Sequence, residues 1–415
     1  MFTLYEPSEQ KVPIKIWLEN IGQLDRICLE QAKNLANLPF AYQHIALMPD
    51  AHAGYGMPIG GILAAEGMIV PNAVGADIGC GMTFVQTNIP AEILITQETP
   101  DGKLAQTIVN TILRSVPNGY EKHKRKQASN VVQQFSWYLE EQEKVGATKE
   151  LANVLDEAYF QAGTLGSGNH FIELQTDGQG LVGVMVHTGS RNVGYAVCHY
   201  FDDKAKQLNS QEHSPVPPEW NLAYLPTESD MGKEYIRWME FAMAFAKENR
   251  AKIMRIVIEI IRNLVAEYAG FTEIELSEPI DCHHNYAAYE EHIGKMVWVH
   301  RKGAIRVREG EWGIIPGAMG MSSYLVKGKG NPESFHSCSH GAGRQMSRKE
   351  ALETFGMDDT IFDLESSGIF LGKTRKRDLG EEARFAYKDI DFVIANELDL
   401  IKPIRKLETL GVVKG

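Results

Sequence analysis

Short apolar runs alternate along the chain with glycine-rich loops and with longer stretches of helical periodicity. In Gly232–Tyr268 the residues Ile236, Met239, Met243 and Ala246 recur at helical spacing, which predicts one long helix. The charged, amphipathic stretch Thr96–Phe160 is also expected to be helical, and it contains the basic run Glu121–Lys126. Strands are predicted at four apolar runs: Ile45–Met48, Thr83–Thr87, Leu181–His187 and Met296–His300.

This order of elements favours an α+β fold in which short strands end in glycine-rich loops. No internal repeat, low-complexity tract or Pro/Ser-rich linker interrupts the chain. We therefore expect one compact domain over residues 1–415, with a central β-sheet or sandwich core. Helical insertions are predicted at about 92–160 and 230–270.

The composition is that of a globular protein, with 44% hydrophobic and 23% charged residues among 415. A formal net charge of −12 argues against a general nucleic-acid coat, but it leaves room for a local basic groove. The five cysteines form no CxxC pair, which disfavours a disulfide framework or a zinc ribbon. The N-terminus lacks a signal-peptide pattern, and charges interrupt the apolar stretches, so a cytoplasmic protein is expected.

Several potential metal ligands stand beside glycines or at the ends of predicted strands. They are Asp77 and Cys80 in AVGADIGCGM, His170 in GTLGSGNHFIEL, His187 in VMVHTGSRNVG, and His284 in DCHHNYA. A carboxylate, a thiolate and imidazoles together suit a divalent transition metal, and five ligands are enough for two ions. A single strand-end histidine is more often a hydrogen-bonded structural residue, so spacing alone leaves the site open. A thiolate favours zinc, whereas a carboxylate and open coordination permit manganese.

His340 is a different kind of candidate, because it heads the segment HGAGR. Glycines let a phosphate approach the backbone, and imidazole is a competent nucleophile toward phosphorus. Arg344 in this segment and Arg191 in HTGSR offer guanidinium groups that suit RNA phosphates. The alternatives are a histidine packed in a glycine turn and arginines held in structural ion pairs.

Eight blocks of the chain resemble the signature blocks of the RtcB family of RNA ligases, in the family's order. The resemblance covers nearly the whole chain, which is compact like the bacterial members. These blocks are MPDAHAGYGMPIGG, VPNAVGADIGCGM, GTLGSGNHFIEL, VHTGSRNVG, HHNYA, PGAMGMSSY, SCSHGAGR and AYKDID.

The resemblance implies a ligase that joins RNA ending in a 2′,3′-cyclic phosphate or 3′-phosphate to RNA with a 5′-hydroxyl. It implies GTP and two Mn²⁺ ions as cofactors, guanylation of His340, and the metal ligands Asp77, Cys80, His170, His187 and His284, with Cys80 bridging. Tyr387, Ser323, Glu173 and the penultimate Lys414 would form the guanine pocket. The other nucleotide contacts implied are Asn169, His170, Phe171, Ile172, His284, Asn285, Pro316, Gly317, Ala318, Met319, His340, Gly341, Ala342 and Gly343.

The sequence leaves some questions open. Ala318 and Met321 stand where many family members carry Ser and Thr, and His283 offers a second histidine beside His284. A dinuclear-metal phosphoesterase acting on cyclic phosphates would need the same metal ligands but not His340 or Lys414. A nucleotide-binding regulator would bind GTP without releasing pyrophosphate. The family also suggests a monomer, an archease-like protein activator, and either tRNA splicing or RNA repair as the biological role.

Overall fold

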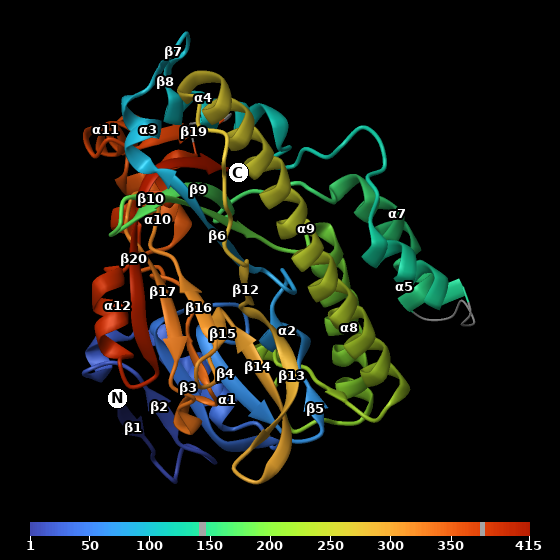
Figure 1. Cartoon of the computed structure of the whole chain (residues 1–415). Helices are drawn as coiled ribbons and strands as arrows, with labels where there is room; N and C mark the ends of the chain where they lie inside the picture. Colours follow the sequence, from blue (N-terminus) through green and yellow to red (C-terminus); the bar gives the residue numbers. More distant parts are fainter. Residues whose placement is uncertain (141–146, 374–377) are drawn as a thin grey trace.

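The computed structural model describes residues 1–140, 147–373 and 378–415, and most of its strands lie in two sheets (Figure 1). The first sheet has the order β1 (Phe2–Leu4), β2 (Ile14–Ile16), β3 (Ala41–His52), β4 (Ile59–Ala65), β14 (Lys295–Lys302) and β13 (Asn285–His292). The second has the order β12 (Ile280–His283), β6 (Gly81–Pro90), β10 (Leu181–Thr188), β9 (Phe171–Asp177), β20 (Ile401–Lys414), β17 (Ser323–Gly328) and β16 (Trp312–Ile315), with β19 (Phe370–Gly372) beside β20. The α+β class and the four strands expected from the sequence are confirmed.

The long helix is also confirmed as α9 (Asp230–Ala269), which crosses one side of the molecule diagonally (Figure 1). The Ser229 hydroxyl caps its start by accepting a hydrogen bond from the Gly232 amide. The first half buries Trp238 and Phe245 against α8 (Asn192–Gln211). The second half packs Ile253 and Val257 on β6 and β10. One helix therefore braces the sheet that carries most of the candidate metal ligands.

The stretch Thr96–Phe160 is only partly helical, which corrects the expectation of a largely continuous helical run. It contains the end of α3 (Ala91–Thr96), a hairpin of β7 (Glu98–Thr99) and β8 (Gly102–Lys103), then α4 (Leu104–Ser115), α5 (Asn130–Glu140), α6 (Ala147–Glu150) and most of α7 (Ala152–Gln161). Residues 141–146 of the predicted helical run lie outside the described residues. The basic run lies in the loop between α4 and α5, because Pro117 cannot continue α4.

Several smaller helices and strands accompany the two sheets. They are α1 (Arg26–Ala36), β5 (Met68–Ile69), α2 (Pro71–Val74), β11 (Leu225–Pro226), β15 (Ala304–Arg306), β18 (Ser337–Ser339), α10 (Arg348–Thr354), α11 (Met357–Ser366) and α12 (Ile390–Asn396). The pair β15–β18 matters most for function, because β18 leads directly into His340. Across the described ranges, no helix combines the length and the apolar character that a membrane crossing needs.

Candidate active site

The register of three neighbouring strands gathers the candidate metal ligands at one end of the second sheet. In the β6–β10 pair Gly81 lies opposite Thr188, and in the β10–β9 pair His187 lies opposite Phe171. Cys80 and His170 immediately precede β6 and β9, so both lie beside His187 at this end. β12 pairs with β6 through His283 and Gly81, which brings the next residue, His284, to the same place. Strand pairing thus assembles ligands that are far apart in the sequence.

The ligand atoms of this cluster are in direct contact. The Cys80 Sγ lies 3.4 Å from the His170 Nε2 and 3.3 Å from the His187 Nε2. The His170 Nε2 lies 3.1 Å from an Asp77 carboxylate oxygen. The His187 Nε2 lies 3.0 Å from the Nε2 of His284. The five residues implied by the sequence therefore form one group, in which Asp77 is partly exposed and the other four are buried. The neighbouring His283 turns instead to the Gly79 carbonyl and the Arg250 guanidinium.

The hydrogen bonds of two rings show that this group suits a cation. The Nδ1–H of His187 donates to the Asn169 carbonyl over 2.9 Å, and the Nδ1–H of His284 donates to the Asn285 side-chain oxygen over 3.2 Å. Asn285 is itself oriented, because its amide donates to the Asp77 carbonyl and its oxygen accepts from the Gly303 amide. Both Nε2 atoms consequently carry lone pairs. Fixing the outer nitrogen in this way is typical of metal-binding histidines.

Burial sets the charge states of the cluster. It lowers the pKa of His187 and of His284 well below the ordinary value, so both imidazoles are neutral, as metal ligands must be. Burial and the Asp77 charge raise the pKa of the Cys80 thiol, so without a cation it keeps its proton. Burial also acts to raise the pKa of Asp77, but His170 outweighs it and the net direction is down. The donor set therefore fits one or two divalent ions, whose binding would release the thiol proton.

His340 lies next to this cluster, with its ring centroid 4.9 Å from that of His284. Its Nδ1–H donates to a carboxylate oxygen of Asp50 over 2.7 Å, and its backbone amide donates to the same oxygen over 3.2 Å. Asp50 is fully buried, and glycines at 60 and 343 allow this approach, because a Cβ at either position would collide with Asp50. With Nδ1 protonated and held, the Nε2 of His340 keeps its lone pair for a substrate.

A cavity opens beside His340 and collects most of the nucleotide contacts expected from the sequence. Two loop segments, 316–319 and 340–343, form one wall, and β9 contributes Phe171 and Glu173. Ile172 alternates to the other face of β9 and packs in the hydrophobic core. His170 and His284 belong to the cluster of candidate metal ligands, Asn285 orients His284, and Ser323 does not line the cavity. The other expected residues on the wall are Asn169, Tyr387 and Lys414.

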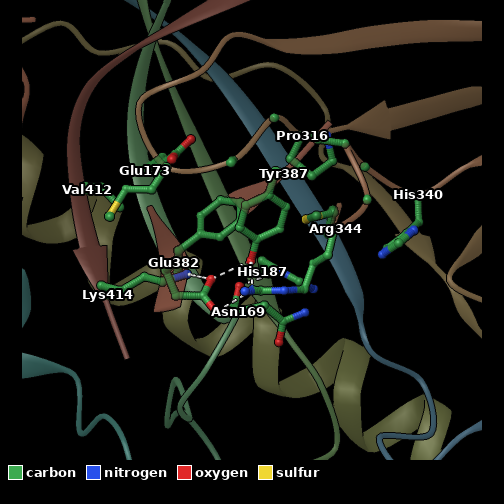
Figure 2. A pocket seen from close by; sticks show the side chains of 18 of the residues that line it. Asn169, Glu173, His187, Pro316, His340, Arg344, Glu382, Tyr387, Val412 and Lys414 are labelled. Carbon is green, nitrogen blue, oxygen red and sulfur yellow. Dashed lines mark hydrogen bonds and ion pairs between the residues drawn. The ribbon is translucent and has the colours of Figure 1, made fainter. Parts of the chain in front are cut away.

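The cavity wall away from His340 is organised around Glu382 (Figure 2). Its carboxylate accepts from the Lys414 ammonium over 2.9 Å and from the Tyr387 hydroxyl over 2.8 Å, and Arg344 lies 3.5 Å away. Burial acts to raise the pKa of Glu382, but Lys414 and Arg348 outweigh it and hold the pKa at about 2. The penultimate residue of the chain is thereby fixed in the cavity wall. No motif in the sequence predicts a role for Glu382.

Glu173 forms a second buried acidic position on the same wall. Burial raises its pKa to about 7. The Gln175 amide donates to the Glu173 carboxylate over 2.7 Å and to the Ser323 hydroxyl over 3.2 Å. Ser323 therefore reaches the cavity only through its neighbours, and it also accepts from the Gly317 amide in the loop that precedes β17. The cavity thus offers a carboxylate and an ammonium group side by side.

Comparison with known proteins decides the family. The family model described as tRNA-splicing ligase RtcB matches residues 31–415. The RNA-splicing ligase RtcB of Escherichia coli is 36% identical over 98% of both chains. The tRNA-splicing ligases RtcB of Pyrobaculum aerophilum and Thermococcus kodakarensis are 32% and 33% identical, over 98% and 93% of this chain and 95% and 91% of their own lengths. The chain belongs to the RtcB family.

In this RtcB chain the two arginines expected to contact RNA phosphates are already engaged with protein groups. Arg191 donates to the Thr164 hydroxyl over 3.0 Å and to the Gly119 carbonyl over 2.9 Å, which ties the loop after α4 to the loop that precedes His170. Arg344 donates to backbone carbonyls and to the Tyr387 hydroxyl on the cavity wall. A phosphate role for either arginine stays a prediction.

Three residues of the RtcB site, Asp50, His52 and Glu382, were not predicted from the sequence. Asp50 and His52 stand in the block MPDAHAGYGMPIGG, which was recognised without assigning them a role. The Nδ1–H of His52 donates to the Asp50 carbonyl over 3.0 Å, so Asp50 orients two imidazoles that both line the cavity or adjoin it. Glu382 stands in an ordinary-looking charged segment, GEEAR. Only the three-dimensional packing shows that it is buried.

Proposed function

We propose that this chain is a GTP- and Mn²⁺-dependent RNA ligase that joins a 3′-phosphate or 2′,3′-cyclic phosphate end to a 5′-hydroxyl end. His340 carries GMP as a covalent phosphoramidate. The observation that supports this most directly is the position of one imidazole. His340 is anchored on Asp50 through Nδ1, its ring centroid lies 4.9 Å from that of the candidate metal ligand His284, and it borders a cavity lined by two glycine-containing loops.

The first step follows from the tautomer of His340. Its Nε2 attacks the α-phosphorus of GTP, a nitrogen–phosphorus bond forms, and the bond to the pyrophosphate oxygen breaks. The ring gains positive character as its lone pair is shared, and the buried Asp50 carboxylate stabilises that charge through Nδ1–H. The same hydrogen bond prevents the ring from rotating, so its Nε2 stays directed toward the α-phosphorus.

Two further transfers complete the reaction. An oxygen of the RNA 3′-phosphate attacks the phosphorus of the GMP group, and the His340 imidazole leaves with its lone pair. The 5′-hydroxyl of the second RNA then attacks the activated 3′-phosphorus and loses its proton, and GMP departs. A cyclic phosphate is first opened by water to a 3′-phosphate. Asp77, Cys80, His170, His187 and His284 would hold the ions, which offset charge on phosphate oxygens and activate a hydroxyl.

The proposed preference for GTP rests on two groups on the cavity wall away from His340. Guanine presents N–H donors at N1 and N2 next to the O6 acceptor. The Glu173 carboxylate matches the donors, and the Lys414 ammonium matches the acceptor. Tyr387 offers an aromatic face for the base, and Glu382 holds the lysine and the tyrosine in place. Adenine, with a donor at position 6, would oppose the ammonium group.

The deciding experiment is incubation with GTP labelled in the α-phosphate and Mn²⁺. The expected result is an acid-labile protein–GMP adduct that is absent from His340→Ala. Hydrolysis of RNA cyclic phosphates without any adduct would favour the dinuclear phosphoesterase. GTP binding without pyrophosphate release would favour the regulator.

We further propose that the protein acts in the cytoplasm as a monomer on RNA ends, with an archease-like activator as a partner in turnover.

A further inference from the structure

A completely buried polar cluster adjoins His340 on the side of its Nδ1 atom. Asp50 from β3, Ser339 from β18 and Glu397 at the end of α12 are all completely buried. The Ser339 amide donates to one Glu397 oxygen over 2.9 Å, and the neighbouring residue, His340, donates twice to one Asp50 oxygen. Glu397 therefore contacts the short strand that carries the candidate nucleophile.

Three oxygens of this cluster have no partner: the Asp50 Oδ1, the Ser339 Oγ and the Glu397 Oε1. Two of them belong to carboxyl groups, and an ionised carboxylate can accept hydrogen bonds but cannot donate any. A buried acceptor without a donor is costly, and two buried carboxylates side by side are costlier still. The Ser339 hydroxyl can donate to one of the two carboxyl oxygens, so the other still lacks a donor, and a proton on one of the two carboxyls supplies it.

The surroundings decide which carboxyl carries this proton. Asp50 receives two donors from His340, which favour its anionic form. Glu397 accepts from the Ser339 amide and lies beside the Ser339 side chain. The titratable groups that act on it are Asp50, Asp399 and Cys338, all of them acidic, whereas the Lys388 cation acts on Asp50. Burial and the Asp50 charge raise the pKa of Glu397 to about 8.

We propose that Glu397 is a neutral carboxylic acid in the working enzyme, and that its proton completes the cluster and keeps Asp50 as the anion that orients the His340 Nδ1–H. Glu397 is then a positioning residue, because it acts on substrate only through Asp50 and His340. The catalytic part of this inference rests on the proposed guanylation of His340. Ionisation of Glu397 would place a second negative charge beside Asp50 and loosen the strand that presents His340.

Infrared spectroscopy tests the proton directly, without any turnover. We expect a carboxylic-acid carbonyl band at neutral pH that disappears as the pH rises through about 8. The band should shift when the wild-type protein is made with ¹³C-carboxyl glutamate. Glu173, whose pKa is about 7, should add a second glutamate component that titrates at lower pH, so the Glu397 component is the one that is lost in Glu397→Gln and kept in Glu173→Gln. Glu365→Gln, which removes an exposed carboxyl, should keep it. A glutamate-insensitive band, or no such band, overturns the inference even if the variant proves unstable.

The rate of adduct formation then tests the consequence. At pH 9, one unit above the pKa, about nine tenths of Glu397 is ionised, so the wild-type rate should fall about tenfold from its neutral value. Glu397→Gln mimics the neutral acid and should show no such alkaline fall. An equal fall in both proteins contradicts the proposed role. If wild-type protein forms no adduct at any pH while the band behaves as expected, the ligase assignment fails and the placement of the proton stands.

Discussion

The Nε2 atoms of His187 and His284 face each other at 3.0 Å, although both rings have already committed their Nδ1 protons to oxygen acceptors. Two lone pairs at this distance repel each other unless a cation lies between or beside them. Strand pairing and outer hydrogen bonds nevertheless hold the rings in this arrangement. A cation bound by these rings would relieve the repulsion, so we expect metal binding to stabilise the fold.

Mn²⁺ should accordingly raise the melting temperature of the wild-type protein. At an ion concentration a hundred times the dissociation constant, the stabilisation is about 2.7 kcal/mol per site. Cys80→Ala should abolish the shift and the adduct together, because it removes the atom shared by His170 and His187. Cys198→Ala is the matched control, since Cys198 is equally buried but packs in the hydrophobic core and donates to the Pro71 carbonyl. A normal Mn²⁺ shift in Cys80→Ala would exclude this thiol as a ligand.

Asp50→Asn tests the anchor of His340. An amide in place of the carboxylate can present its NH₂ group to Nδ1, which moves the ring proton to the nitrogen that should attack. We expect adduct formation to slow by roughly two to four powers of ten, with little change in the KM for GTP. The measurement is single-turnover labelling with α-labelled GTP. A rate within threefold of wild type would show that the anchor does not matter for chemistry.

The sequence was informative about the site where local motifs determine the geometry. Asp77, Cys80, His170, His187 and His284 each stand beside a glycine or at a strand end, and the pairing of β6, β9, β10 and β12 brings them together as expected. Glu382 and Glu397 were missed for a physical reason. A glutamate in a charged or mixed segment is normally exposed, and only the packing of distant elements buries these two.

The helical prediction for the basic run Glu121–Lys126 was wrong, because contacts with distant residues decide the structure of this loop. Composition and charge favoured a helix, but Pro117 and the contacts of the following loop override that preference. The Arg191 guanidinium and the Gly166 carbonyl both hold Gly119. Such long-range backbone contacts leave no periodicity in the sequence. Helix boundaries were therefore predictable for α9, where apolar spacing is regular, and not between α4 and α5.

If GTP binds as proposed, Glu173 should make its binding depend on pH. Its carboxyl has a pKa of about 7, and only the ionised form accepts both guanine N–H donors. The KM for GTP should therefore fall as the pH rises from 6 to 8, and Glu173→Gln should remove most of this dependence and raise the KM. Isothermal titration with GTP at several pH values checks the sign directly. Weaker binding at pH 8 than at pH 6 would contradict the assignment of Glu173 to the base.

The loop after α4 offers the last test, because it separates RNA binding from guanylation. Tyr120 is 93% exposed and borders a second hollow that it shares with Lys414 and Gly415. Downstream, Lys122 and Lys126 are paired with Glu157 and Asp156 on α7. Within residues 1–140, 147–373 and 378–415, Lys124 and Arg125 form no ion pair, so their charges are free for RNA phosphates.

Changing Lys124 and Arg125 together to Ala should weaken RNA binding while the rate of adduct formation stays at the wild-type level. If both side chains contact phosphates, the slope of log affinity against log salt should become shallower by about 1.4 for single-stranded RNA. Lys122 and Lys126 changed together to Ala remove the same charge from paired positions and should alter the slope much less. Equal effects of the two double variants would mean that net charge matters and that the RNA follows another surface.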